Sequence, residues 1–215
     1  MGRIFYVSSM HGDDTNSGQT PEDAFRSLRK INQLEIQPGD QIFLERGSVF
    51  IGEYLHLYAG GTKEAPVVVD AYGEGALPRI EADGNGIWYQ NYGGHLDNVV
   101  HTWKGYLSSA VLLYDAEYIS IRNLEITNNP CIKNERLNQA DRMNRTGVSV
   151  IAQNHGTLHQ IELDHLYIHD VEGNIYDKHL NNGGIYMSVS RPDDEEKTGI
   201  ARYDGIHIHH CKVEN

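Results

Sequence analysis

The sequence predicts an all-β solenoid, in which short parallel strands stack coil upon coil behind a short N-terminal helix. Composition supports the β class, since 22 glycines and 13 tyrosines against 4 phenylalanines suit short strands joined by tight turns. An internal repeat supports the solenoid. Residues 119–126, 161–168 and 206–213 carry apolar side chains at their first, third, sixth and eighth positions. The alternative is a β-sandwich with accidental periodicity, but a sandwich has no reason to repeat two registers, this one and the one described next.

A second alternation repeats together with the first. Its members are three pairs of apolar residues, and each pair lies 37 residues after the one before: Val111 and Leu113, Val148 and Val150, Ile185 and Met187. Alternation directs apolar side chains inward, and the extra residue between the third and sixth template positions indicates a bend. Each unit therefore comprises three short strands, and equivalent residues of adjacent coils are expected about 4.8 Å apart.

Residues 1–40 are expected to form a cap with one strand and one helix, ahead of coils that occupy residues 41–215. Thr20 offers a capping hydroxyl before Pro21, and an apolar helical face follows until about Gln33. Short strands are then predicted at residues 41–45, 53–58, 67–72 and 79–82, separated by turns rich in glycine or containing proline.

Charge and cysteine usage exclude several classes of protein. The formal net charge of −12 argues against a nucleic-acid binder held by a general basic field. No apolar run is long enough to span a membrane, and the first residues lack the apolar core of a signal peptide. Cys131 and Cys211 have no CxxC spacing, so neither a disulfide framework nor a zinc knuckle is indicated.

Four N-terminal segments resemble the cap of right-handed parallel β-helix proteins of the pectate-lyase-like superfamily. They are residues 5–8 (FYVS), 12–18 (GDDTNSG), 24–28 (AFRSL) and 38–42 (PGDQI). This resemblance implies a carbohydrate-active protein that is secreted, periplasmic or on the cell surface. The last template ends without a capping segment, so we expect the N-terminal part of a longer protein, or a partner that covers the end of the solenoid.

Aligning the coils predicts four columns of neighbouring side chains. They are Ser120, Glu162 and His207; Asn123, His165 and His210; Thr127, His169 and Glu214; and Asn128, Asp170 and Asn215. Asparagine at such bends bonds its neighbours in a ladder, so a structural role is expected for the second and fourth columns.

Two long connections, residues 128–147 and 170–184, are expected to project from the same side of the stack and to form a cleft. Glycoside hydrolysis needs two carboxyl groups, one as acid and one as nucleophile or base. Asp170, with Asp204 and Glu172 behind it, is the predicted catalytic carboxylate. The expected contacts with a polysaccharide or oligosaccharide substrate are Lys178, Arg202, Tyr176 and His169.

Two other functions remain open at this point. A polysaccharide lyase would use a Lys or Arg base and possibly calcium, and Arg136, Arg142 and Arg145 offer a basic patch for an acidic sugar. A non-catalytic glycan-binding or adhesive solenoid would present exposed aromatic side chains such as Tyr176, Tyr203 and Trp88.

No metal site or cofactor is expected, although calcium is a possibility. His207 and His209 point outward on one strand, but spacing fixes no third ligand, so exposed strand histidines are favoured over a zinc site. The oxygen-rich residues 13–16 suit calcium, and they suit an Asx-turn before the helix better.

Overall fold

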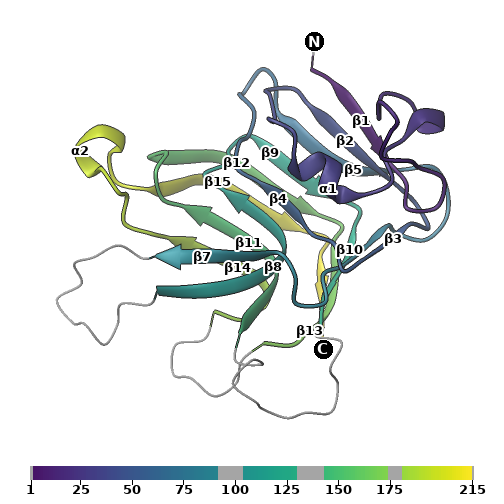
Figure 1. Ribbon diagram of the computed structural model, residues 1–215. Helices are drawn as coiled ribbons and strands as arrows, with labels where there is room; N and C mark the ends of the chain where they lie inside the picture. Colours follow the sequence, from purple (N-terminus) through teal and green to yellow (C-terminus); the bar gives the residue numbers. More distant parts are fainter. Residues whose placement is uncertain (1, 92–103, 130–142, 174–180, 215) are drawn as a thin grey trace.

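β-strands are the main secondary structure of the chain, and they form three parallel sheets (Figure 1). This computed structural model describes residues 2–91, 104–129, 143–173 and 181–214. The first sheet contains, in spatial order, β1 (Ile4–Val7), β2 (Gln41–Glu45), β5 (Val67–Tyr72), β9 (Ile119–Arg122), β12 (Thr157–Asp164) and β15 (Arg202–His209). The second contains β16 (Lys212–Val213), β13 (Tyr167–Val171), β10 (Glu125–Asn128), β6 (Arg79–Glu81) and β3 (Val49–Ile51). The third contains β14 (Gly183–Val189), β11 (Asn144–Ala152), β8 (Lys104–Tyr114) and β4 (Leu55–Leu57), with β7 (Ile87–Asn91) antiparallel to β8.

The repeated templates pair in the predicted register. Ile119 lies opposite Ile161, which lies opposite Ile206, and the second frame pairs Val111 with Val148 and Val148 with Ile185. The buried members of these rows belong to one continuous apolar cluster. The sequence periodicity therefore identified both the strands and their neighbours, because inward-facing positions must coincide from strand to strand.

A single left-handed residue makes the bend between the first and second sheets in three successive passes of the chain. Asn123, His165 and His210 have φ values of 56°, 50° and 53°. Each sits at the extra position of its template, where a bend was predicted. Asparagine and histidine are among the non-glycine residues that adopt this conformation most readily.

Of the other three predicted columns, the one that begins at Ser120 is confirmed, the one that begins at Thr127 is confirmed in part, and the one that begins at Asn128 is wrong. Ser120, Glu162 and His207 pair in sequence, and Thr127 pairs with His169. Asn128 pairs with Val171 rather than Asp170, because a bulge at Asp170 (φ 48°) adds one residue to β13. Asn215 lies outside the described residues.

The predicted continuous helix in the cap is wrong. A 3₁₀ turn, η1 (Pro21–Asp23), is capped by the Thr20 hydroxyl, and a separate helix, α1, covers Leu28–Asn32. The segment between them stays extended because the Asp14 carboxylate accepts hydrogen bonds from the N–H groups of Arg26 and Ser27. The predicted strand at residues 53–58 shortens to β4, and the boundary at residue 40 stays a prediction.

The Asx-turn predicted in the cap is confirmed. The Asp13 carboxylate accepts hydrogen bonds from both the N–H group and the hydroxyl of Thr15, at 2.8 and 2.7 Å. The remaining helix, α2 (Glu195–Thr198), is a single turn in the connection before β15. Among the described residues, no helix has the length and apolar character needed to cross a membrane.

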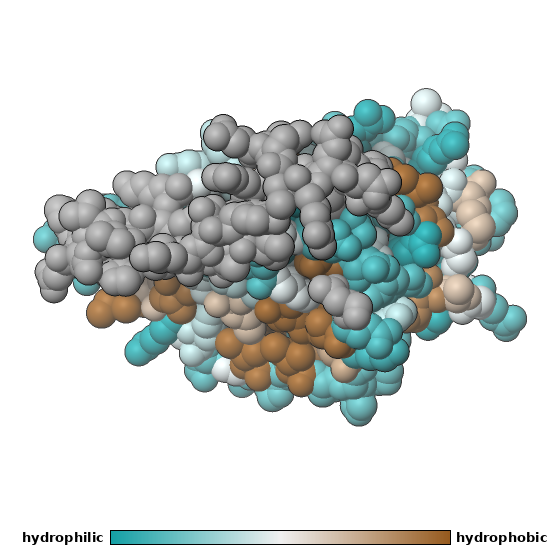
Figure 2. Space-filling view, turned by 90° about the horizontal axis from the view of Figure 1, so that it is seen from below, coloured by the Kyte–Doolittle hydropathy of each residue, from teal (hydrophilic) through white to brown (hydrophobic). Residues whose placement is uncertain are grey.

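β14, β15 and β16 are the edge strands at one end of the three sheets. Several large apolar side chains on them are exposed, namely Val189, Ile206, Ile208 and Val213. The face of the molecule seen in Figure 2 likewise carries hydrophobic patches between hydrophilic side chains. This edge of the three sheets therefore presents both unpaired backbone and apolar surface.

Candidate active site

The connections from β10 to β11 and from β13 to β14 leave the sheets at one corner, as predicted. β10 pairs with β13 and β11 pairs with β14, both in parallel, so equivalent strand ends lie side by side. We use "the corner" for the described residues where β10 and β13 end and where β11 and β14 begin. The predicted residues His169, Asp170 and Glu172 lie at the corner.

Asn128 holds the base of the corner together and is fully buried. Its Oδ1 accepts a hydrogen bond from the Gly84 N–H group at 2.9 Å, and its Nδ2 donates to the Thr146 carbonyl at 3.0 Å. The same side chain bonds Ser108. These contacts link three successive parts of the chain, so the structural role expected for this asparagine is confirmed.

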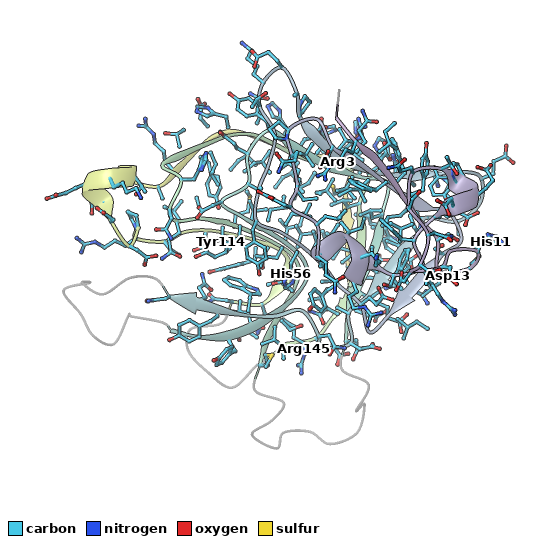
Figure 3. The ribbon with its side chains drawn as sticks, turned by 45° about the horizontal axis from the view of Figure 1, so that its top comes forward. Arg3, His11, Asp13, His56, Tyr114 and Arg145 are labelled. Atoms are coloured by element: carbon cyan, nitrogen blue, oxygen red, sulfur yellow. The ribbon has the colours of Figure 1, made fainter. Side chains whose placement is uncertain are left out.

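Arg145 places a buried positive charge at the corner. It lies in β11 with 6% of its surface exposed, on the lower side of the molecule and away from the cap residues His11 and Asp13 (Figure 3). Its Nη1 donates to the Glu172 carbonyl at 3.1 Å, and its own N–H group donates to Asn182 Oδ1 at 2.9 Å. Gly84 makes room for the guanidinium, since a Cβ there would lie 3.3 Å from Arg145 Nε.

His169 lies between two carboxylates. Its Nδ1 is 2.8 Å from Asp170 Oδ2, its Nε2 is 3.1 Å from Glu125 Oε1, and its ring stacks on Tyr167 at 4.3 Å. Burial opposes protonation, but the hydrogen bonds and charges of Asp170 and Glu125 outweigh it and raise the pKa of His169. Asp170 keeps 60% of its side chain exposed, so one of its faces is open to a ligand.

Glu172 follows Asp170 by two residues and is exposed. Its N–H group donates to the Asn128 carbonyl at 3.3 Å, while its own carbonyl binds Arg145. Tyr176 and Lys178 lie outside the described residues. Among the predicted site residues that are described, the corner thus brings together two exposed carboxylates, an imidazole and, through the backbone, a guanidinium.

Asp204 and Arg202 lie elsewhere, on β15 of the first sheet. Asp204 is 72% exposed and pairs with His159 Nδ1 at 3.2 Å, and Arg202 Nε donates to the Thr157 hydroxyl at 2.6 Å. Asp170 and Asp204 therefore belong to different sheets. Tyr203 lies between Arg202 and Asp204 in the sequence. Its hydroxyl donates to the Val150 and Ser188 carbonyls at 2.7 Å, which links the first sheet to the third.

An open groove of about 670 Å³ runs along the outer face of the first sheet near Asp204. The Tyr118 and His159 rings stack there at 5.7 Å. The polar side chains along the groove are Lys63, Ser120, Gln160, Glu162 and His207. A flat ring pair bordered by hydrogen-bonding groups is a surface that suits a sugar ring.

Trp88 does not offer the exposed aromatic surface expected of a glycan-binding solenoid. This side chain is buried, and its Nε1 donates to the Ser109 hydroxyl at 2.8 Å. Sequence reasoning also missed Glu125, Gly84 and Asn182. The repeat contained a signal for Glu125, because its register places it opposite Tyr167, beside His169. No pattern within the sequence indicated Gly84 or Asn182.

Comparison with known proteins points first to glycoside hydrolases, although no family model matches the chain. The particular relatives are lacto-N-biosidases. A lacto-N-biosidase of Bifidobacterium longum is 37% identical over a 246-residue alignment that covers all of this chain and 15% of the relative. Two crystal structures of the GH136 lacto-N-biosidase from Eubacterium ramulus, one native and one a selenomethionine derivative, are 55% identical with TM-scores of 0.90. They cover 97–98% of this chain, which spans 34% of theirs.

The resemblance to the pectate-lyase-like superfamily is therefore corrected. The N-terminal motifs that suggested it belong to a chain whose similar proteins are GH136 lacto-N-biosidases. Those motifs form β1, the Asx-turn, the extended segment that leads into α1 and the start of β2. Local turn and strand chemistry of this kind recurs among unrelated parallel-sheet proteins, so it did not identify a superfamily.

Proposed function

We propose that this chain is part of a glycoside hydrolase with lacto-N-biosidase activity, acting on oligosaccharides. The observation that carries the proposal is the similarity to the Eubacterium ramulus enzyme, with a TM-score of 0.90 and 55% identity over 98% of the chain. The chain spans only part of its relatives, so the activity is proposed for the whole protein that contains it. The relatives favour hydrolysis over the lyase alternative, because both are named as glycosidases.

We also propose that the three sheets form one right-handed parallel β-helix. The order in which the chain visits the sheets supports this, since β9, β10 and β11 are followed by β12, β13 and β14 in the same sequence of sheets. Crossovers between parallel strands are right-handed in nearly all proteins. Exposed Ile206, Ile208 and Val213 at the edge support a further segment of the protein, or a partner, stacked on that end.

Within this function, Asp170 and Glu172 are the carboxylates we propose for acid and nucleophile or base. Both are exposed at one corner, where Arg145 adds positive charge and His169 holds Asp170 in a fixed position. Asp204 is the alternative partner, beside the groove on the first sheet. Lys178, Tyr176 and Arg202 remain proposed substrate contacts, and location outside the cytoplasm remains a prediction.

The test uses the protein in its full natural length with a chromogenic aryl lacto-N-bioside. We expect release of the aryl group, and a loss of turnover of about 100-fold or more in Asp170→Asn and Glu172→Gln. Asp193→Asn, at an exposed loop, is the control. Wild-type protein that leaves the substrate intact would refute the activity. Full turnover in both corner variants would refute the assigned carboxylates and leave the activity standing.

A further inference from the structure

Three histidines and one aspartate converge at the bends between the first and second sheets. Asp164 Oδ1 lies 2.6 Å from His165 Nδ1 and 3.0 Å from both His209 Nδ1 and His210 Nδ1. The ligand atoms of Asp164, His165 and His210 all lie within 4.8 Å of one another. We call these four residues the histidine cluster. It joins two neighbouring bends, because Asp164 and His165 lie at the end of β12, whereas His209 and His210 lie at the end of β15.

The three ring Nδ1 atoms of the histidine cluster lie 2.6–3.0 Å from one carboxylate oxygen, Asp164 Oδ1. His209 Nδ1 is 2.9 Å from His210 Nδ1, a separation at which one of the two nitrogens must present a lone pair to the other. The rings of His165 and His210 stack at 4.6 Å, which places both Nδ1 atoms beside the same carboxylate oxygen. Nitrogen lone pairs that lie this close repel one another, and a bound cation would attract them.

A second layer of contacts fixes the orientation of His209. Its Nε2 lies 3.2 Å from Glu162 Oε1, and Glu162 in turn accepts a hydrogen bond from the Ser120 hydroxyl at 2.7 Å. When Nε2 carries the proton and donates it to Glu162, Nδ1 is left unprotonated and faces the histidine cluster. Histidine ligands in metal sites are commonly oriented by a carboxylate in this manner.

We propose that the histidine cluster binds a divalent transition-metal cation, with Zn²⁺ as the cation that fits best. Asp164, His165, His209 and His210 supply three imidazole nitrogens and one carboxylate oxygen, a donor set that zinc accepts in tetrahedral sites. Bonds of about 2.0–2.1 Å imply separations between ligand atoms of about 3.3 Å. The three ring nitrogens now lie 2.6–3.0 Å from Asp164 Oδ1, so each needs only a small movement to reach that spacing from the carboxylate oxygen. His165 and His209 must also approach each other, because the group of ligand atoms that all lie within 4.8 Å of one another includes His165 and His210 but not His209. Calcium and magnesium prefer oxygen ligands and do not match this set.

The bound cation would act as a structural link between adjacent coils. Its ligands come from two bends that are 45 residues apart in the sequence and adjacent in space. Four protein ligands leave no open position for substrate, which is typical of structural rather than catalytic zinc. Binding to the folded chain alone raises its stability with metal concentration. The proposal does not depend on the glycosidase activity.

The test is a calorimetric titration of tag-free, metal-stripped chain with ZnCl₂ alone. We expect one Zn²⁺ per chain, and a loss of affinity of about 10- to 100-fold or more in His165→Asn and in His210→Asn. Asparagine is chosen because the preceding bend carries Asn123 in the same left-handed conformation, so these variants keep the fold. His155→Ala is the matched control, since His155 is also exposed but contacts one carboxylate, that of Glu117.

Two further readouts separate a coordination site from weak surface binding. Co²⁺ in place of Zn²⁺ should give the intense visible absorption of a four-coordinate ion, and Zn²⁺ should raise the melting temperature of wild type and His155→Ala only. The proposal is overturned if wild type binds no zinc, if both bend variants bind it as wild type does, or if His155→Ala loses binding equally.

Discussion

Ile161 and Ile206 occupy the same apolar row, and their truncation tests the order of the strands in the first sheet. Ile161 is fully buried between Ile119 and Ile206, whereas Ile206 on the edge strand is 38% exposed. Ile161→Ala removes three buried carbon groups, which costs about 2.4 kcal/mol of transfer free energy at 0.8 kcal/mol each. An unfilled cavity adds to this, so we expect a loss of about 3–4 kcal/mol in the free energy of unfolding.

Ile206→Ala is the matched control in the same row. More than a third of the Ile206 surface is already exposed, and β15 is an edge strand among the described residues, so we expect a loss of only about 1–1.5 kcal/mol. Urea unfolding followed by far-UV circular dichroism gives both values, and unchanged m-values show that each variant unfolds from the same compact state. Equal losses in the two variants would contradict the central position of Ile161 and with it the order of the strands.

Three other predictions concern polar side chains. Asn128→Ala leaves the Gly84 N–H group and the Thr146 carbonyl without their partner, so unfolding free energy should fall by about 3 kcal/mol in urea titrations. A loss below about 1 kcal/mol would contradict a stabilising role for these buried hydrogen bonds of Asn128. Burial lowers the pKa of His56 to about 4, against about 6.5 in the unfolded chain, so the folded state binds fewer protons between these values. Stability should therefore rise by about 3 kcal/mol from pH 4 to 6.5, and His56→Gln should remove most of that rise. The pH dependence of stability that comes from His169 has the opposite sign, because its pKa is raised in the folded state. Its contribution to stability is complete below the pKa of the unfolded chain and is lost as pH rises through the pKa of the folded state. His169→Gln should flatten that decline, and an unchanged pH profile would show that the two flanking carboxylates do not hold a charge on the ring.

The strands and their register could be predicted because successive passes of the chain through the sheets repeat one inward-facing pattern. Ile119, Ile161 and Ile206 share a template position, and burial forces such positions into alignment. The predicted pairing of Asn128 with Asp170 was wrong because of the bulge at Asp170. One extra residue in β13 is set by local backbone geometry and leaves no periodic signal in the sequence. The cap helix was overestimated because Asp14, distant in sequence, accepts N–H groups that a helix would have used.

The candidate site was only partly accessible from the sequence. Asp170 and Glu172 were identified because they follow a template strand into a long connection. Asp204 was grouped with them as a carboxylate expected on the same side, but it lies in another sheet. The column of Asn123, His165 and His210 was predicted in register. Its metal-binding potential was missed because Asp164 and His209 lie beside the column rather than in it, and side-chain rotation brings their atoms to the same point.

The bend made by one left-handed residue also limits where this architecture can change. Residues 119–126, 161–168 and 206–213 cross it with the same number of residues, whereas the connections at the other two corners differ widely in length between coils. An insertion at the bend would displace Asn123, His165 or His210 from its row. Among these three passes, variation in loop length is thus expected at the other two corners, whereas in the two earlier passes residues 46–48 and 73–78 connect the first sheet to the second.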